Sequence, residues 1–374
     1  MTGLRFLRAT LTMAAGVLLA CGTAQARQRP LTVTVRPSAY DRYQAGEAQR
    51  VMRHVMPANT AAARAALQAK QFDVQPGNAG AQWPAPSLSP STQGATDRDP
   101  ADLQYHGGSV VQSAVQYLIY VNVDRNRSCN SVASCWGDPA GFLHDLDHSD
   151  FIHVVDPYVG ETDGDRYRVS QDVIYVNDRA TGRPYTDADI QAIVHAVVAA
   201  LGLPTGYQSI YDVFLPPGQD VCSGRPFTSC YSPDRPSVFA FCAYHSSADF
   251  RDIGHVLYTV EPFQDVAGCA SRPNGPNGPL ADSTNNTLSH ETIETITDPD
   301  GTAWWNELNN ALYQDEIADE CSFLVFNPPP PALPGPQSSV YFDPSTVELN
   351  GVPYLVQPEY ANATHRCTTA PGGD

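Results

Sequence analysis

The chain has 374 residues and a formal net charge of −18 at pH 7, from 22 basic and 40 acidic side chains. This acidic balance argues against a nucleic-acid partner, because phosphate binding needs a basic surface. It suits an exported protein or one that binds cations.

The first 26 residues have the composition of a secretory signal peptide. Two arginines precede an apolar run at 11–19, and a small-x-small cleavage site follows at 24–26. This combination predicts removal of residues 1–26 and a secreted, extracellular chain. The run Leu18–Cys21 also matches a bacterial lipobox, so lipoprotein anchoring through Cys21 is the alternative. No other segment is apolar enough to span a bilayer, and we expect no transmembrane segment.

The cysteine content fits an oxidising compartment. Of nine cysteines, eight remain once the predicted signal peptide is removed. An even number in an exported chain predicts disulfides, although eight cysteines allow about 105 pairings. Proximity along the chain favours the pairs Cys129–Cys135, Cys222–Cys230, Cys242–Cys269 and Cys321–Cys367.

Residues 27–104 are interpreted as a variable N-terminal segment, with one or two helices expected within 45–67. The stretch 75–100 is rich in Pro, Gly, Ser, Gln and Ala and has almost no apolar periodicity, which is typical of a disordered linker. The part before this linker is either a spacer or a pro-segment. Residues 105–374 are predicted to form one domain, of a size that a single core can support.

Apolar and β-branched runs in this domain predict several strands and a long helix. The expected strands are 115–123, 172–176, 209–215, 238–244, 255–260, 340–342 and 352–356. Between 190 and 201 apolar residues recur at helical spacing, with Thr186 as the N-cap and Gly202 at the C-terminal end. Strands and helices do not alternate regularly, so we expect an α+β fold with a mixed sheet packed on a few helices.

The run 288–297 contains His-Glu-x-x-Glu, one residue type away from the His-Glu-x-x-His of zinc peptidases. Polar N-cap residues upstream and the pair Asp298-Pro299 bound a predicted helix. Residues four apart on a helix share one face, so His290 and Glu294 are placed to hold one metal ion. Glu291 would then act as general base for an attacking water.

We expect a third ligand from the acidic cluster at 314–321. Glu316 and Asp319 stand three residues apart, so either could complete a His-carboxylate-carboxylate zinc site with a position left for water. A site made of carboxylates would instead suit calcium. Asp298 is roughly 12 Å along the helix from His290 and is expected to form helix-end hydrogen bonds.

A competing interpretation applies to these charged residues, because exposed helix faces commonly carry such groups. It applies most strongly to His144 and His148, which also stand four residues apart. We expect this second pair to lie on a solvated polar face.

Several short motifs in the domain occur in an order shared with a known family. They are Tyr105-His106-Gly107-Gly108, Phe241-Cys242-Ala243-Tyr244-His245, His290-Glu291-x-x-Glu294-x-x-Thr297-Asp298-Pro299, Trp304-Trp305 and Glu316-Ile317-Ala318-Asp319-x-Cys321. In this order the chain resembles the EXORDIUM, or phosphate-induced protein, family of plants and its bacterial relatives. The resemblance covers residues 105–367.

The resemblance implies an exported, disulfide-braced protein associated with the cell wall, for which the family offers no firmly established reaction. The chain departs from the plant pattern in three places. Asp298 stands where plant members have Asn, a proline-rich stretch at 328–336 replaces a glycine-rich one, and the first 100 residues have no counterpart.

Two hypotheses about function follow. The first is a secreted zinc-dependent hydrolase with a zincin-like domain, acting on a peptide amide or an ester, in which His245 or His106 would steady the oxyanion. The second is a non-catalytic extracellular protein that binds a cell-wall polymer or carbohydrate and has a structural acidic or calcium site.

Overall fold

The computed structural model describes residues 30–35, 54–63, 101–123, 129–161, 165–178, 183–223, 227–306, 316–327 and 341–370. The predicted signal peptide with Cys21, the stretch 75–100 and the proline-rich stretch 328–336 lie outside these residues. Within the described part of the chain, no helix is both long and apolar enough to cross a lipid bilayer.

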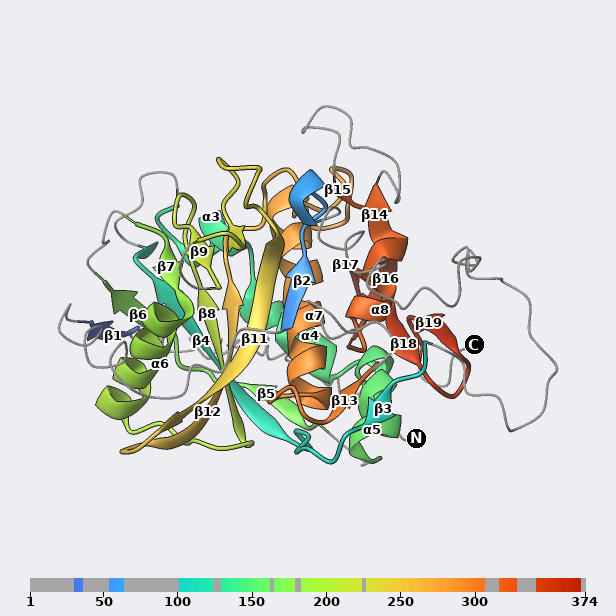
Figure 1. Ribbon diagram of the computed structural model, residues 1–374, viewed down its shortest axis with the longest axis horizontal. Helices are drawn as coiled ribbons and strands as arrows, with labels where there is room; N and C mark the ends of the chain where they lie inside the picture. Colours follow the sequence, from blue (N-terminus) through green and yellow to red (C-terminus); the bar gives the residue numbers. More distant parts are fainter. Residues whose placement is uncertain are drawn as a thin grey trace, which may run out of the picture.

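A mixed sheet of eight strands forms the centre of the fold (Figure 1). In the order in which they lie side by side, the strands are β1 (Leu31–Thr34), β6 (Ile174–Asn177), β4 (Ala114–Val121), β8 (Ser209–Phe214), β12 (Gly254–Glu261), β11 (Phe241–Phe250) and β2 (His54–Pro57), with β5 (Tyr167–Val169) paired to the start of β4. Neighbours from β1 to β12 are parallel, whereas β11 runs antiparallel to both β12 and β2. The sheet therefore has one antiparallel edge.

Both faces of this sheet are covered, which explains the nearly continuous apolar sequence of its central strands. In β4, Leu118 and Tyr120 join the core on one face, while Ile119 and Val121 join the core on the other. Strand β8 is buried along its whole length. The strands predicted from these apolar runs are confirmed, with ends shifted by at most three residues except in β11, which ends at Phe250, six residues later than predicted.

The helices divide between the two faces of the sheet. They are α3 (Val132–Trp136), α4 (Pro139–Asp147), α5 (Asp156–Val159), α6 (Asp187–Leu201), α7 (Pro279–Thr297) and α8 (Asp319–Ser322), with 3₁₀ turns η2 (Asp150–Val155) and η4 (Phe323–Val325). Helix α6 belongs to the core on one face, whereas α3, α4 and α7 belong to the core on the other. The α+β class with a mixed sheet and few helices is thus confirmed.

Helix α6 begins and ends where its sequence predicts. Its first turn is closed by Asp189, whose carboxylate accepts from the Thr186 backbone N–H at 2.8 Å and from the Thr186 hydroxyl at 2.9 Å. Its last turn ends at Gly202, which has φ 63° and ψ 38°. Glycine adopts this left-handed conformation without the Cβ clash of other residues.

Smaller sheets brace the periphery of the described structure. One of them has three strands, β10 (Cys230–Tyr231), β9 (Val221–Cys222) and β7 (Tyr185–Thr186). The others are two-stranded: β13 (Trp304–Trp305) with β3 (Gln104–Tyr105), β14 (Phe326–Asn327) with β15 (Tyr341–Phe342), β16 (Ser345–Leu349) with β17 (Val352–Val356), and β18 (Glu359–Ala361) with β19 (Arg366–Thr368). Of these, β17 packs against α7.

All four predicted cysteine pairs lie at disulfide distance. The pair Cys222–Cys230 joins β9 to β10, and Cys321–Cys367 joins α8 to β19. The pair Cys242–Cys269 links β11 to the segment before α7, while Cys129–Cys135 closes a short loop at α3. The pair Cys242–Cys269 therefore braces the antiparallel edge of the sheet against the segment that leads into α7.

The N-terminal segment departs from its prediction. Residues 54–57, which lie within the expected helices, form β2 and pair with β11, and residues 31–34 form β1 at the opposite edge. A helix across 54–57 is wrong because tertiary pairing with an open sheet edge outweighs a weak local preference, whereas 61–63, at the start of the later expected run, are helical. Both strands belong to the same sheet as residues beyond 105, so the predicted boundary at 104 does not separate them from it.

Candidate metal centre

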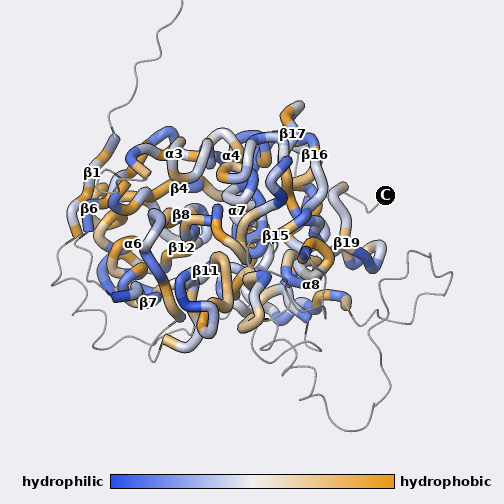
Figure 2. The backbone as a smooth tube through the Cα atoms, turned by 90° about the horizontal axis from the view of Figure 1, so that it is seen from above, coloured by the Kyte–Doolittle hydropathy of each residue, from blue (hydrophilic) through white to orange (hydrophobic). Residues whose placement is uncertain are grey.

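Helix α7 is polar and yet buried, and this combination locates the candidate site. Every residue from Asp282 to Thr297 is buried, although the helix carries few apolar side chains (Figure 2). Leu288, Ile293 and Ile296 supply its apolar contacts with the core. The remaining buried residues are polar, so each must find a partner within the protein or in a bound ligand.

Helix α7 contains many threonines, a residue type that also favours strands. Their hydroxyl groups form hydrogen bonds with the backbone of the helix. The hydroxyls of Thr287, Thr295 and Thr297 donate to carbonyl oxygens four residues earlier, at 3.1, 2.6 and 3.2 Å. Such bonds satisfy hydroxyl groups that water cannot reach. The helix predicted over 288–297 is confirmed, and it begins earlier, at Pro279.

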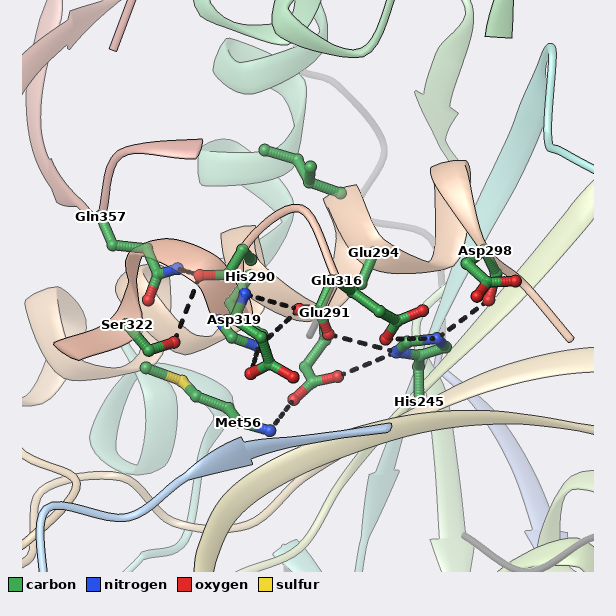
Figure 3. A network of polar contacts seen from close by, with 12 residues as sticks. Met56, His245, His290, Glu291, Glu294, Asp298, Glu316, Asp319, Ser322 and Gln357 are labelled. Atoms are coloured by element: carbon green, nitrogen blue, oxygen red, sulfur yellow. Dashed lines mark hydrogen bonds and ion pairs between the residues drawn. The ribbon is translucent and has the colours of Figure 1, made fainter. Parts of the chain in front are cut away.

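Two residues of α7 and one of α8 bring ligand-type atoms together (Figure 3). His290 Nε2 lies 3.1 Å from Glu294 Oε1 and 3.6 Å from Asp319 Oδ1. The backbone N–H of Asp319 donates to Glu294 Oε1 at 3.1 Å. One ligand atom from each of the three buried residues lies within 4.8 Å of the others. Of the two residues expected as third ligand, Asp319 is therefore the one beside His290 and Glu294.

His245 faces the same helix from the sheet. Strand residues alternate between faces, so Tyr244 joins the core on the α6 face while its neighbour His245 points to α7 (Figure 3). His245 Nδ1 lies 3.3 Å from Glu291 Oε2 and 3.6 Å from Glu294 Oε2. His245, Glu291 and Glu294 form a second group with one ligand atom each within 4.8 Å of the others. Glu294 thus belongs to both groups.

The fourth predicted ligand, Glu316, lies on the other side of the His245 ring. Glu316 Oε2 is 3.8 Å from His245 Nε2, and the same nitrogen is 3.2 Å from the backbone oxygen of Asp298. The Asp298 carboxylate accepts from the backbone N–H groups of Thr302 and Ala303, both at 2.7 Å. The helix-end role expected for Asp298 is confirmed, and Glu316 contacts the imidazole without joining either three-residue group.

The sequence did not predict the participation of two further residues near these histidines and carboxylates. The backbone N–H of Met56 in β2 donates to Glu291 Oε1 at 3.2 Å, and this contact was missed because a helix was expected there. Glu359 of β18 is fully buried, neither of its carboxylate oxygens has a hydrogen-bond partner, and its charge acts on Glu294. A single glutamate in a short strand has no periodicity that would have identified it.

Burial dominates the electrostatics of the carboxylates. It raises the pKa values of Glu291, Glu316 and Glu359 well above their usual range, and the charge of Glu294 raises all three further. The cause is the cost of holding several negative charges in a region from which water is excluded. Within this group of acids, neutralisation requires protons or cations.

The two imidazoles respond in opposite directions. Burial lowers the pKa of His245, and the opposing effect of Glu294 does not reverse the shift. Burial also acts to lower the pKa of His290, but the nearby Glu294 and Glu291 charges outweigh it and the pKa is raised. We refer to these residues together as the buried cluster, which consists of His245, His290, Glu291, Glu294, Glu316, Asp319 and Glu359.

Other histidines singled out in the sequence lie apart from the buried cluster. His144 and His148 stack on each other at 4.3 Å between ring centroids, and their side chains are 59% and 35% exposed. The solvated face expected for this pair is confirmed, although His148 also contacts the exposed Asp165 at 3.2 Å. His106 stacks on Trp305 at 3.7 Å between ring centroids, and its Nε2 lies 3.3 Å from the Trp305 backbone oxygen.

Searches against protein-family models, curated proteins and solved structures found no match for this chain. The candidate site therefore stands on its own geometry, which is that of two overlapping His-carboxylate groups joined by Glu294.

Proposed function

We propose that this chain is an exported, zinc-dependent hydrolase with a zincin-like domain, and that His290, Glu294 and Asp319 hold the ion. One observation carries the proposal. Ligand atoms from these three residues, which come from α7 and α8, lie within 4.8 Å of one another in a fully enclosed setting. Buried carboxylates repel one another, and buried charged groups lose their hydration. A cation bound between these residues would offset both costs and so explain why they lie together.

The donor set fits zinc. One imidazole nitrogen and two carboxylate oxygens provide three protein ligands, which is the number that catalytic zinc sites use. Glu294 Oε2 has no hydrogen-bond partner, and His290 Nε2 faces the carboxylates of Glu294 and Asp319 at 3.1 and 3.6 Å, although the His290 and Glu294 side chains are completely buried. Buried polar atoms left in this state point to a missing ligand.

A bound zinc ion would supply Lewis-acid polarisation of a substrate carbonyl and of water. The protein's own contribution is positional. Met56 N–H holds Glu291 Oε1, which leaves Oε2 directed at the cluster, where it is placed to take a proton from water. The oxyanion role suggested for His245 finds no support in its contacts, because its nitrogens face carboxylates and the Asp298 backbone oxygen.

Export is supported by the four disulfide-distance pairs, since such bonds persist in oxidising compartments. The signal-like N-terminus and the resemblance to the EXORDIUM family point the same way and suggest a peptide or cell-wall polymer as substrate.

Elemental analysis of the purified full chain, together with a hydrolysis assay on peptide and ester libraries, tests the proposal. We expect zinc to co-purify, Asp319→Asn to reduce zinc content, and Glu291→Gln to abolish hydrolysis while the protein remains folded. A zinc-free protein that takes up no zinc from solution would rule the hydrolase out. A matched control is Asp252→Asn, which alters an exposed His-Asp contact outside the cluster.

Complete burial favours a second candidate function. Six of the seven cluster residues are 0% exposed and Asp319 is 2% exposed, which leaves the ligands shielded from solvent. A structural cation, zinc or calcium, would then tie α7 to α8 and β11 in a non-catalytic extracellular binding protein. Under this alternative, removing the metal lowers the thermal midpoint of unfolding, and Glu291→Gln affects stability without any hydrolytic activity being lost.

A further inference from the structure

We propose that the buried cluster holds two metal ions, with a second cation bound by His245, Glu291 and Glu294, and with Glu294 bridging both. This inference rests on the metal site proposed above and extends it from one ion to two. It assigns to His245 the role of a metal ligand.

The contacts of the His245 ring supply the first argument. Its Nε2 lies 3.2 Å from the backbone oxygen of Asp298, and a carbonyl oxygen can only accept, so Nε2 carries a proton. In the neutral ring, Nδ1 then presents a lone pair to Glu291 Oε2 at 3.3 Å and Glu294 Oε2 at 3.6 Å. A lone pair and two carboxylate oxygens attract each other only through a shared proton or a cation, and a cation is the occupant that we propose. A backbone carbonyl that holds the distal N–H of an imidazole is also the usual support for a metal-ligating histidine.

The two oxygens of Glu294 supply the second argument, because they face different groups (Figure 3). Glu294 Oε1 lies 3.1 Å from His290 Nε2 and accepts from the Asp319 N–H, whereas Oε2 lies 3.6 Å from His245 Nδ1 and has no hydrogen-bond partner. A carboxylate with one oxygen on each side is the geometry of a bridging ligand. Two-metal sites hold their ions about 3.5–4 Å apart, a spacing that a single carboxylate spans.

Charge supplies the third argument. The buried cluster contains five carboxylic acids and, within it, only the imidazoles of His245 and His290 can become positive. Glu261, also fully buried, adds its charge to that of Glu291. One divalent ion leaves much of this charge in a dry region, where each unpaired carboxylate costs several kcal/mol. Two divalent ions match it more closely.

The ligand types indicate the class of metal. Each ion would have one imidazole and two carboxylates, with Glu294 shared, and such mixed nitrogen and oxygen sets suit zinc, manganese and iron more than calcium. With a second ion in place, Glu291 becomes a ligand of that ion instead of a free base. Glu359, whose carboxylate oxygens lack hydrogen-bond partners, is a further buried acid that is affected by the charge of Glu294.

Metal stoichiometry tests the inference on the full, disulfide-bonded chain. The protein is stripped with a chelator, reloaded with zinc, freed of excess by gel filtration and measured by elemental analysis. We expect about two zinc ions per chain, as in dinuclear hydrolases. His245→Gln and Asp319→Asn should each halve this number, and Glu294→Gln should reduce it to near zero.

The outcomes separate this inference from the proposed function. One ion per chain that Asp319→Asn removes and His245→Gln leaves in place would overturn the second site, keep the first, and assign the His245–Glu291 contact to a shared proton. No ion in the unaltered chain would overturn both. Two ions without any hydrolytic activity would keep the dinuclear site and reject the hydrolase.

A control variant and a second measurement protect the test from folding defects. His255→Gln alters a histidine of β12 that contacts Asp249 at 2.7 Å and Asp300 at 3.2 Å outside the cluster, and should leave metal content unchanged. Loading the unaltered chain with manganese requires no substitution. Two adjacent manganese ions give an exchange-coupled electron paramagnetic resonance spectrum, whereas the six-line spectrum of an isolated ion at full loading would contradict the proposal.

Discussion

Helices α6 and α7 lie on opposite faces of the same sheet, and both bury acidic residues, but they treat them differently. On α6, Asp187 accepts from Gln191 at 2.8 Å, Tyr244 at 3.1 Å and Tyr258 at 2.7 Å. Asp189 accepts two bonds from one guanidinium group at 2.6 and 2.9 Å. The acids of α6 are thus satisfied by neighbouring protein groups.

On the α7 side of the sheet, several carboxylate oxygens of the buried cluster have no hydrogen-bond partner. They are Glu294 Oε2 and both oxygens of Glu359 in β18, while Glu291, which accepts from Met56 N–H, is also acted on by the charge of Glu294. A buried acid with protein partners serves the fold, whereas a buried acid without them indicates a ligand. Substitutions on both faces of the sheet test this contrast between the two sets of buried acids.

The largest effect is expected for Glu294→Gln, which removes the carboxylate shared by both groups. Loss of groups that only orient a ligand costs 10–100-fold in metal affinity, so loss of the ligand itself should weaken binding by more than about 100-fold. Zinc titration of the purified variant measures this. If the variant binds zinc as tightly as the parent, Glu294 of α7 is not a metal ligand, and the contrast with the acids of α6 fails.

A pH-dependent effect of similar size is expected on the α6 side, with no involvement of metal. Burial raises the pKa of Asp187 to about 6, opposed by hydrogen bonds from Tyr258, Tyr244 and Gln191. Because the folded state keeps a proton that the unfolded chain has lost, the contribution is favourable below about pH 4 and is lost as pH rises through 6. At about 1.4 kcal/mol per pKa unit, stability should fall by roughly 3 kcal/mol across this window.

The measurement for Asp187 is a difference between two proteins, because other groups also titrate. Chemical denaturation at several pH values should show a shallower decline for Asp187→Asn than for the parent chain between pH 4 and 6. Parallel curves for the two proteins would show that the α6 hydrogen bonds, and not burial, control this carboxyl group.

Metal removal should destabilise the α7 side by an intermediate amount. A ligand at 100 times its dissociation constant stabilises the folded state by about 3 kcal/mol, which corresponds to a midpoint shift of roughly 5–10 °C in a domain of this size. Thermal unfolding with and without a chelator measures the shift. Asp319→Asn is the matched variant, in which the chelator should have a clearly smaller effect.

The smallest effect is expected at the start of α6. Thr186→Ala removes a hydroxyl that lies 2.9 Å from Asp189 Oδ2 at the N-cap, and such substitutions cost about 1 kcal/mol. Denaturant unfolding of the variant should show this loss with unchanged metal content. A change in metal content would mean that the two faces of the sheet are coupled.

Much of the candidate site was predictable because it depends on helical spacing. His290 and Glu294 are four residues apart, so a helix brings them together wherever it packs. The sequence predicted either Glu316 or Asp319 as the third ligand. Residue spacing alone does not decide which of these two side chains points toward His290. The contacts of His245 with Glu291 and Glu294 could not be predicted from the sequence, because they depend on which strand face meets α7.

The sequence by itself determined the features that arise within one segment: the limits of α6, the helical state of the His-Glu-x-x-Glu run, the strands β4, β6, β8, β11 and β12 of the central sheet and the cysteine pairs close along the chain. Only the tertiary structure decided that β2 completes the sheet at Met56, that the charge of Glu294 acts on the buried Glu359, and that Glu294 faces two histidines. The physical reason is that local structure follows from neighbouring residues, whereas burial and charge compensation depend on segments more than 50 residues apart.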